Sequence, residues 1–186
     1  MGATLGQGGS AARPLFFLDV DGTLLPLGGA RIPSGPQGWA DWQAPSNPQL
    51  AKIDASHVPR LLALPCELIW ATAWMADANK VLSPLLGLPH LPVADLPDPP
   101  PRYGPDVLNW KTRALVRAAA GRPFVWVDDE IGELDHTWVS THHGGHALLH
   151  RVDSATGLTE ADFVVIDEWV LGRSWSRGRG RGRTRG

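Results

Sequence analysis

The sequence predicts a single α/β domain in which a mostly parallel β-sheet is covered by helices on both faces. Two observations predict it. Short apolar runs of strand length alternate with helical patterns from Pro14 to Leu171, and the 186 residues are a length typical of one domain. Strands joined through helices pair in parallel, and ligands of such folds bind beyond the carboxyl ends of the strands. Polar residues that directly follow a predicted strand are therefore the candidates for a functional site.

The elements follow from periodicity and from helix and turn signals. Strands are expected at residues 14–20, 66–71, 124–127 and 147–152, with a shorter one at 90–94. Helices are expected within residues 49–64 and over 75–86, 106–120, 133–142 and 159–171. Residues 106–120 have the clearest amphipathic pattern, with a predicted buried face of Val107, Trp110, Leu115 and Ala118. Thr159, with Asp162 three residues later, is expected to cap the last helix.

Composition divides the chain into a leader, a domain and a tail. Residues 1–13 are rich in Gly and Ala and are expected to be a flexible leader, followed by the domain over residues 14–171. Residues 172–186 form an Arg/Gly-rich, low-complexity tail that is expected to be disordered. Residues 25–48 are rich in Gly and Pro but contain Trp39 and Trp42, which favours an ordered flap or irregular loop over a linker.

Charge and cysteine content restrict the partners and the compartment. The net charge is −2, and the arginines at 173 and beyond supply +6, so residues 1–172 carry −8. An acidic body repels nucleic acid, and any RNA contact would depend on the tail or on local patches. The single cysteine, Cys66, cannot form an internal disulfide and fits a buried thiol in a reducing cytoplasm. The first apolar run ends at Asp19, too early to span a membrane.

Four polar groups occur at predicted strand ends or near a predicted helix start. In chain order they are Asp19-Val20-Asp21-Gly22-Thr23, Thr72, Lys111 and Asp128-Asp129. Acidic residues at two strand ends would repel each other without a cation, and Mg²⁺ suits them because it prefers oxygen ligands and bridges carboxylates to phosphate. Lys111 would offset negative charge, and Thr72 could donate a hydrogen bond to a phosphoryl oxygen. The pattern predicts a magnesium-dependent phosphate site.

Simpler interpretations exist for each group. Asp19 and Asp21 could be a polar exit from a strand, and Thr72 could cap the next helix. Lys80 is the only other lysine between Thr72 and Asp128, although its position favours a solvent-exposed helix face. Asp129 could be a direct metal ligand or a supporting residue. Glu130 and Asp135 are expected to be solvated, although either could complete the metal shell indirectly.

The four groups, in this order, resemble the signature motifs of the haloacid dehalogenase-like (HAD) superfamily. The resemblance implies a Rossmann-like three-layer fold and an aspartyl-phosphate intermediate on Asp19, with Asp21 as general acid and then general base. It also implies that Asp128 binds Mg²⁺ together with Asp19 and the backbone carbonyl of Asp21, supported by Asp129. The short interval between Thr23 and Thr72 leaves room only for a minimal cap.

A narrower resemblance points to nucleic acid. The segments Trp70-Ala71-Thr72-Ala73-Trp74 and Trp126-Val127-Asp128-Asp129-Glu130 are similar to the small HAD domains associated with bacterial Swiss Army Knife RNA-repair proteins. We therefore expect a phosphatase that acts on a small phosphorylated molecule or on a nucleic-acid terminal phosphate. The alternatives are a non-catalytic module that binds metal and phosphate, and an RNA-associated protein that works through its tail. Several tryptophans are expected to line a cleft, or else to fill the core.

Overall fold

The computed structural model describes residues 12–100 and 107–175. It is an α/β domain whose central sheet has four parallel strands, β1 (Leu15–Leu18), β2 (Glu67–Trp70), β3 (Phe124–Asp128) and β4 (Ala147–Arg151). The strand order is β2-β1-β3-β4, with β1 and β3 in the centre. The predicted leader up to residue 11 and the predicted tail from residue 176 lie outside the described residues.

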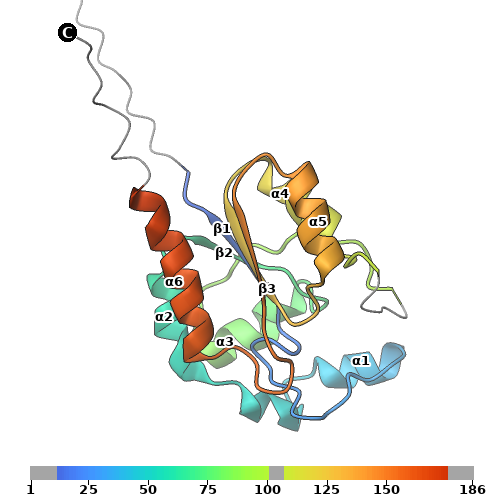
Figure 1. Cartoon of the computed structure of the whole chain (residues 1–186). Helices are drawn as coiled ribbons and strands as arrows, with labels where there is room; N and C mark the ends of the chain where they lie inside the picture. Colours follow the sequence, from blue (N-terminus) through green and yellow to red (C-terminus); the bar gives the residue numbers. More distant parts are fainter. Residues whose placement is uncertain (1–11, 101–106, 176–186) are drawn as a thin grey trace, which may run out of the picture.

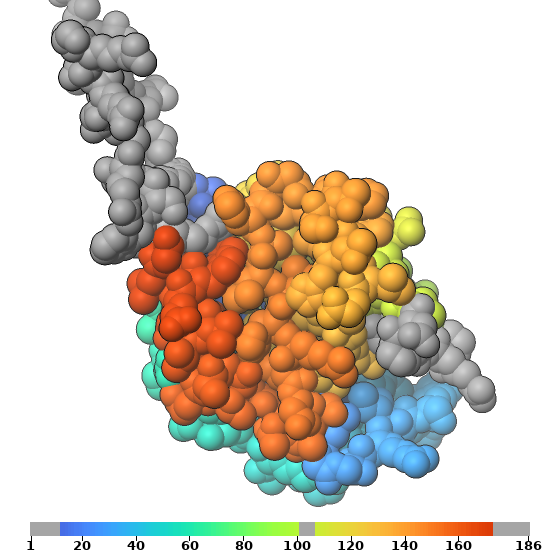
Figure 2. Space-filling model, in the orientation of Figure 1, coloured from blue at the N-terminus to red at the C-terminus, as the bar shows by residue number. Residues whose placement is uncertain are grey.

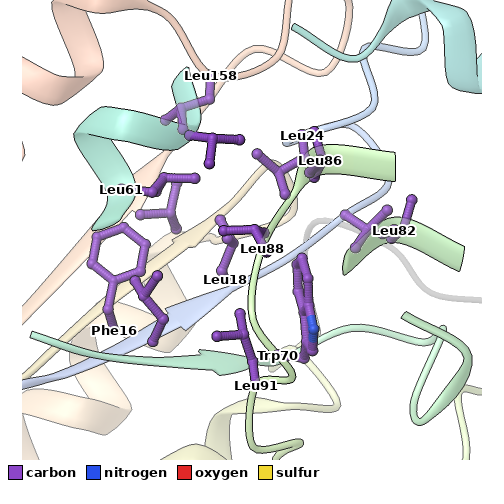
Figure 3. Close-up of a cluster of buried hydrophobic side chains, with 14 of the residues drawn as sticks. Phe16, Leu18, Leu24, Leu61, Trp70, Leu82, Leu86, Leu88, Leu91 and Leu158 are labelled. Atoms are coloured by element: carbon purple, nitrogen blue, oxygen red, sulfur yellow. The ribbon is translucent and has the colours of Figure 1, made fainter. Parts of the chain in front are cut away.

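Helices cover both faces of the sheet (Figure 1), as the sequence predicts. On one face lie α2 (Val58–Ala63), α3 (Ser83–Leu86) and α6 (Glu160–Trp175); on the other lie α4 (Thr112–Ala119) and α5 (Glu133–His142). The strands are buried because alternate side chains enter two separate clusters: Phe16 and Leu18 pack in one, and Leu15 and Phe17 in the other. Figure 3 shows the first cluster, where leucines from α2, α3 and the connecting loops surround Phe16 and Trp70.

The connection from β1 to β2 contains an insertion. Residues 25–48 are ordered, as predicted, and include the short helix α1 (Pro36–Trp42). In Figure 2 this blue segment forms a lobe at the lower edge of the molecule. The helix expected within residues 49–64 consists of two 3₁₀ turns, η1 (Pro48–Lys52) and η2 (Ala55–His57), followed by α2. A cap of this size is minimal.

The fifth strand expected at residues 90–94 is not formed. Val93 makes only an isolated bridge to Trp70, flanked by the hydrogen bonds Trp70 N to Pro92 O (2.9 Å) and Ala94 N to Trp70 O (2.8 Å). Pro89 and Pro92 have no backbone N–H, so this segment lacks the donors needed to extend a ladder at the sheet edge.

Two helices have boundaries that differ from the prediction. The helix expected at 106–120 begins only at Thr112, because the Asn109 side chain accepts a hydrogen bond from Lys111 N (2.9 Å) and holds the chain in a turn. Val107 is consequently exposed and outside the helix, and Ala118 is exposed on its outer face. The last helix, α6, runs to Trp175 and so continues past the predicted end of the domain.

The region 75–86 is helical from Ala78, first as a π-helical segment, η3 (Ala78–Leu82), and then as the α-helix α3. Cys66 is buried, as expected. Within the described part of the chain, none of the helices has the length and apolar character needed to cross a bilayer.

Candidate active site

The register of the two central strands brings Asp19 and Asp128 together. Leu18 on β1 lies opposite Val127 on β3, and Asp19 N donates a hydrogen bond to Val127 O (3.2 Å). The next residue on each strand is an aspartate, so both carboxylates lie at the carboxyl edge of the sheet. Each is almost completely buried, at 4 % and 0 % exposed. The sequence prediction that the two strand ends converge is confirmed.

Lys111 lies between these two carboxylates. Its Nζ is 2.7 Å from Asp19 Oδ1 and 2.7 Å from Asp128 Oδ2, and its side chain is 3 % exposed. Lys80, the competing lysine, is on the surface and pairs with Asp77. The structure therefore brings Lys111, and not Lys80, to the predicted site.

Asp129 reaches the same site because Gly22 leaves room for it. Gly22 has φ +73°, and a Cβ built on it would lie 2.3 Å from Asp129 Oδ2. Any other residue would meet the Asp129 carboxylate and would also strain the turn. One carboxylate oxygen from each of Asp19, Asp128 and Asp129 lies within 4.8 Å of the others. The Asp-Gly turn of the first motif thus shapes the place of an acidic residue about a hundred positions later in the chain.

The pKa values reflect an excess of buried negative charge. Burial raises the pKa of Asp19 well above its ordinary value, and the nearby carboxylates of Asp128 and Asp129 raise it further, against the opposing effect of Lys111. Burial, with Asp128 and Glu130 nearby, raises the pKa of Asp129 to about 7. Burial would lower the pKa of Lys111, but Asp128 and Asp19 outweigh it and raise that pKa, so the lysine stays charged. One lysine does not neutralise three aspartates.

This charge balance fits a divalent cation. Three clustered carboxylates offer the hard oxygen ligands that Mg²⁺ prefers, and the positive charge would relieve the repulsion that raises the pKa values of Asp19 and Asp129. The described residues that could hold the ion by side chain are Asp19, Asp128 and Asp129. The Asp21 carboxylate is not part of this cluster, and the contact that the HAD resemblance implies for it is through the backbone carbonyl.

Asp21 instead faces two tryptophans. Trp42 Nε1 donates to Asp21 Oδ1 (2.7 Å), and Trp74 Nε1 donates to Asp21 Oδ2 (2.9 Å). Burial raises the pKa of Asp21, while the two indole hydrogen bonds and Lys111 lower it. The sequence indicated that tryptophans line a cleft or fill the core but did not connect these two with the second aspartate.

Thr72 lies immediately beyond β2 and is fully buried. Its Oγ1 accepts a hydrogen bond from Trp74 N (3.3 Å), so its local role is to close a turn. The simpler interpretation of Thr72 as a helix cap is wrong, because the next helical segment begins only at Ala78, after Asp77. Because a hydroxyl both accepts and donates, this bond leaves its proton available for a phosphoryl oxygen. The two roles of Thr72 are therefore compatible.

Asp135 is a residue whose role the sequence analysis missed. It was expected to be solvated, but it is 1 % exposed. Its carboxylate accepts hydrogen bonds from Asn109 N (2.8 Å), Gly132 N (2.8 Å) and Thr112 Oγ1. Asp135 thereby joins the start of α5 to the turn that carries Lys111. Its place on the first turn of a helix, three residues after a glycine, was the available signal.

Comparisons with known proteins agree with this architecture. Residues 15–163 match the protein family described as the HAD domain in Swiss Army Knife RNA repair proteins. A solved structure with a similar fold is the HAD domain of the effector protein Lem4 from Legionella pneumophila, an inactive mutant. It is 11 % identical, has a TM-score of 0.52, and the match covers 91 % of this chain and 100 % of that one. No curated protein matches the sequence significantly. Because the family match spans most of the chain and contains all four motifs, the chain belongs to the family of HAD domains found in Swiss Army Knife RNA repair proteins.

Proposed function

We propose that this HAD domain is a Mg²⁺-dependent phosphomonoester hydrolase. The observation that carries the proposal is the meeting of Asp19, Asp128 and Lys111 at the carboxyl edge of the sheet, with Asp129 in the same cluster. A buried carboxylate beside a buried ammonium group provides a nucleophile together with a positive charge that attracts an anionic substrate.

In the proposed first step, a carboxylate oxygen of Asp19 forms a bond to phosphorus as the bond from phosphorus to the leaving oxygen breaks. Asp21 donates its proton to that oxygen, which releases an alcohol and leaves an aspartyl-phosphate. Lys111 and the hydroxyl of Thr72 stabilise the phosphoryl oxygens. Bound Mg²⁺, held by Asp19, Asp128, Asp129 and the Asp21 carbonyl, would supply charge neutralisation.

In the second step, Asp21 takes a proton from water while the water oxygen bonds to phosphorus. The bond between phosphorus and Asp19 then breaks, which frees inorganic phosphate and regenerates the Asp19 carboxylate. Asp21 ends the cycle protonated, ready for the next substrate. The same side chain acts as acid and then base, so a single well-placed carboxyl group is sufficient.

The test is hydrolysis of p-nitrophenyl phosphate with Mg²⁺ or with EDTA, by the wild type and by Asp19→Asn. We expect activity that requires both the metal and Asp19. Asp77→Asn, which changes an exposed aspartate paired with Lys80, is the matched control and should retain full activity. If Asp19→Asn retains substantial turnover, covalent catalysis by Asp19 is refuted. Tight Mg²⁺ binding without turnover in the wild type would support the non-catalytic binding module.

For the substrate, we propose a terminal phosphate of a nucleic acid. The family is described by its occurrence in RNA repair proteins, and the small insertion between β1 and β2 provides no large cap to enclose a small metabolite. A panel of oligonucleotides with 5′ or 3′ phosphates, compared with sugar phosphates, tests this proposal. A higher kcat/KM for sugar phosphates would refute it without affecting the assignment of Asp19.

A further inference from the structure

The carboxylate of Asp21 has a hydrogen-bond donor on each oxygen, and both donors are indoles. Trp42 Nε1 lies 2.7 Å from Oδ1 and Trp74 Nε1 lies 2.9 Å from Oδ2. All three side chains are buried. A donor on each oxygen fixes the rotation of the carboxyl group as well as its position. An indole N–H only donates and does not ionise, so neither tryptophan competes with Asp21 for a proton.

The two tryptophans come from different parts of the chain. Trp74 follows β2, and its backbone N–H is tied to the hydroxyl of Thr72 (3.3 Å). Trp42 is the last residue of α1, within the insertion between β1 and β2. Asn47 Nδ2 donates to the Trp42 carbonyl (2.7 Å) and holds the end of that helix.

Helix α1 docks on the domain through one face. Trp39 and Trp42 are three residues apart and therefore lie on the same side of the helix. Trp39 packs edge-on against Trp74, with ring centroids 6.5 Å apart, while Trp42 is part of the buried core cluster. Helix α1 thus provides the Trp42 donor to Asp21, and its Trp39 anchors the helix against Trp74, the second donor.

We propose that Trp42 and Trp74 are positioning residues that hold Asp21 in the orientation needed for proton transfer, and that the insertion is thereby a working part of the site. This inference rests on the proposed function. A carboxyl group must lie within hydrogen-bond reach of the leaving oxygen to protonate it, and a free aspartate would rotate among several orientations. A carboxylate oxygen has more than one lone-pair site, so it can carry a proton while it accepts from an indole.

The kinetic test replaces each indole by a ring without a donor. Trp42→Phe and Trp74→Phe should lower kcat for an alkyl phosphate by about 10- to 100-fold. This is at or below the lower limit of the roughly 10²–10⁴-fold that general acid catalysis supplies, because Asp21 remains in place but is held less firmly. They should affect p-nitrophenyl phosphate much less, because its leaving group needs little protonation. Trp39→Phe is the control, since Trp39 packs edge-on against Trp74, whereas the indole donors to Asp21 are Trp42 and Trp74. Because Trp74 is completely buried, Trp42→Phe is the deciding variant.

If Trp42→Phe loses no more activity on the alkyl phosphate than Trp39→Phe does, the positioning role is wrong. KM should stay nearly constant, because the tryptophans are proposed to act on a proton transfer and not on substrate binding. An equal loss on both substrates would indicate general damage to the fold and would also contradict the proposal.

A spectroscopic test is independent of catalysis. The indole N–H signals of Trp42 and Trp74 are assigned in ¹H–¹⁵N NMR spectra by their loss in the two Phe variants. Asp21→Asn keeps the shape of the side chain but replaces one acceptor oxygen by an NH₂ group, so at least one of the two signals should shift. Asp77→Asn should move neither.

The two tests separate the possible failures. If phosphate esters are hydrolysed but both indole signals stay in place in Asp21→Asn, the hydrogen bonds are absent and the positioning role is refuted alone. If the signals shift but the wild type hydrolyses neither ester, the proposed function has failed, and the positioning role fails with it.

Discussion

Replacing Lys111 by methionine removes the positive charge that lies between Asp19 and Asp128. Methionine keeps an unbranched chain of similar length, so the packing around it changes little. Two buried carboxylates, each 2.7 Å from the ammonium group in the native protein, lose their partner. Removing one member of a buried ion pair costs about 3–5 kcal/mol, because the remaining charge is neither solvated nor paired.

We expect Lys111→Met to lower the free energy of unfolding by about 3–5 kcal/mol. The loss should lie toward the upper end of this range, because Lys111 pairs with two carboxylates. A typical domain is stable by only about 5–15 kcal/mol, so the variant should unfold at much lower denaturant concentration. The assay is urea denaturation followed by tryptophan fluorescence, in EDTA so that no metal ion replaces the lost charge. It is done at pH 8 to favour the ionised form of Asp19, whose pKa is raised by burial.

The matched control is Lys80→Met. Lys80 also makes a 2.7 Å contact with an aspartate, Asp77, but its side chain is 72 % exposed. Pairs of this kind contribute about 0–1 kcal/mol. If Lys111→Met costs no more than Lys80→Met, the two buried contacts of Lys111 do not stabilise the site, and the electrostatic reasoning is refuted.

Three further predictions concern the metal cluster and the tail. Gly22→Ala should weaken Mg²⁺ binding, measured by calorimetry, because the added Cβ meets the Asp129 carboxylate. In the control Gly35→Ala, where φ is +83° and the space around the Cβ is open, only the backbone is strained and Mg²⁺ binding should not change. Equal effects of the two variants would contradict the steric argument. The folded-state pKa of Asp129, about 7, is above its ordinary 3.8, so its contribution to metal-free stability is complete below about pH 4 and is lost as the pH rises through about 7. Asp129→Asn should flatten that fall in denaturation measured at several pH values, and an unchanged slope would exclude Asp129 as its source. Deleting residues 176–186 should leave phosphatase activity intact and reduce RNA affinity in low salt; unchanged affinity would exclude the tail as an RNA contact.

Local patterns in the sequence were sufficient to predict the order of the strands along the chain and the residues at their ends. Apolar runs of strand length alternate with helical patterns, which is sufficient to predict a parallel sheet and therefore the convergence of Asp19 with Asp128. The apolar runs are local features of the sequence, because a strand covered by helices on both faces needs apolar side chains at successive positions. The choice of Lys111 over Lys80 also followed from local context, since Lys80 follows Thr72 closely on a helix that was expected to expose it to solvent.

Other features depend on contacts between distant segments, which periodicity does not encode. The fifth predicted strand failed for lack of backbone donors at Pro89 and Pro92, and the helix before β3 began late because Asn109 formed a competing turn. Asp135 was expected at the surface, but the segment that carries Asn109 packs against it and buries it.

The surroundings of Asp21 were the least predictable part of the site. Trp42 lies 21 positions from Asp21 and Trp74 lies 53 positions away, and both were visible in the sequence only as bulky aromatic residues. Their N–H groups point to one carboxylate because α1 folds back onto the segment after β2, a packing arrangement that is decided by the shape of the whole core. Sequence determined which groups could carry out the chemistry, and tertiary packing decided which neighbours hold them, because hydrogen-bond direction depends on the relative placement of elements that are far apart in the chain.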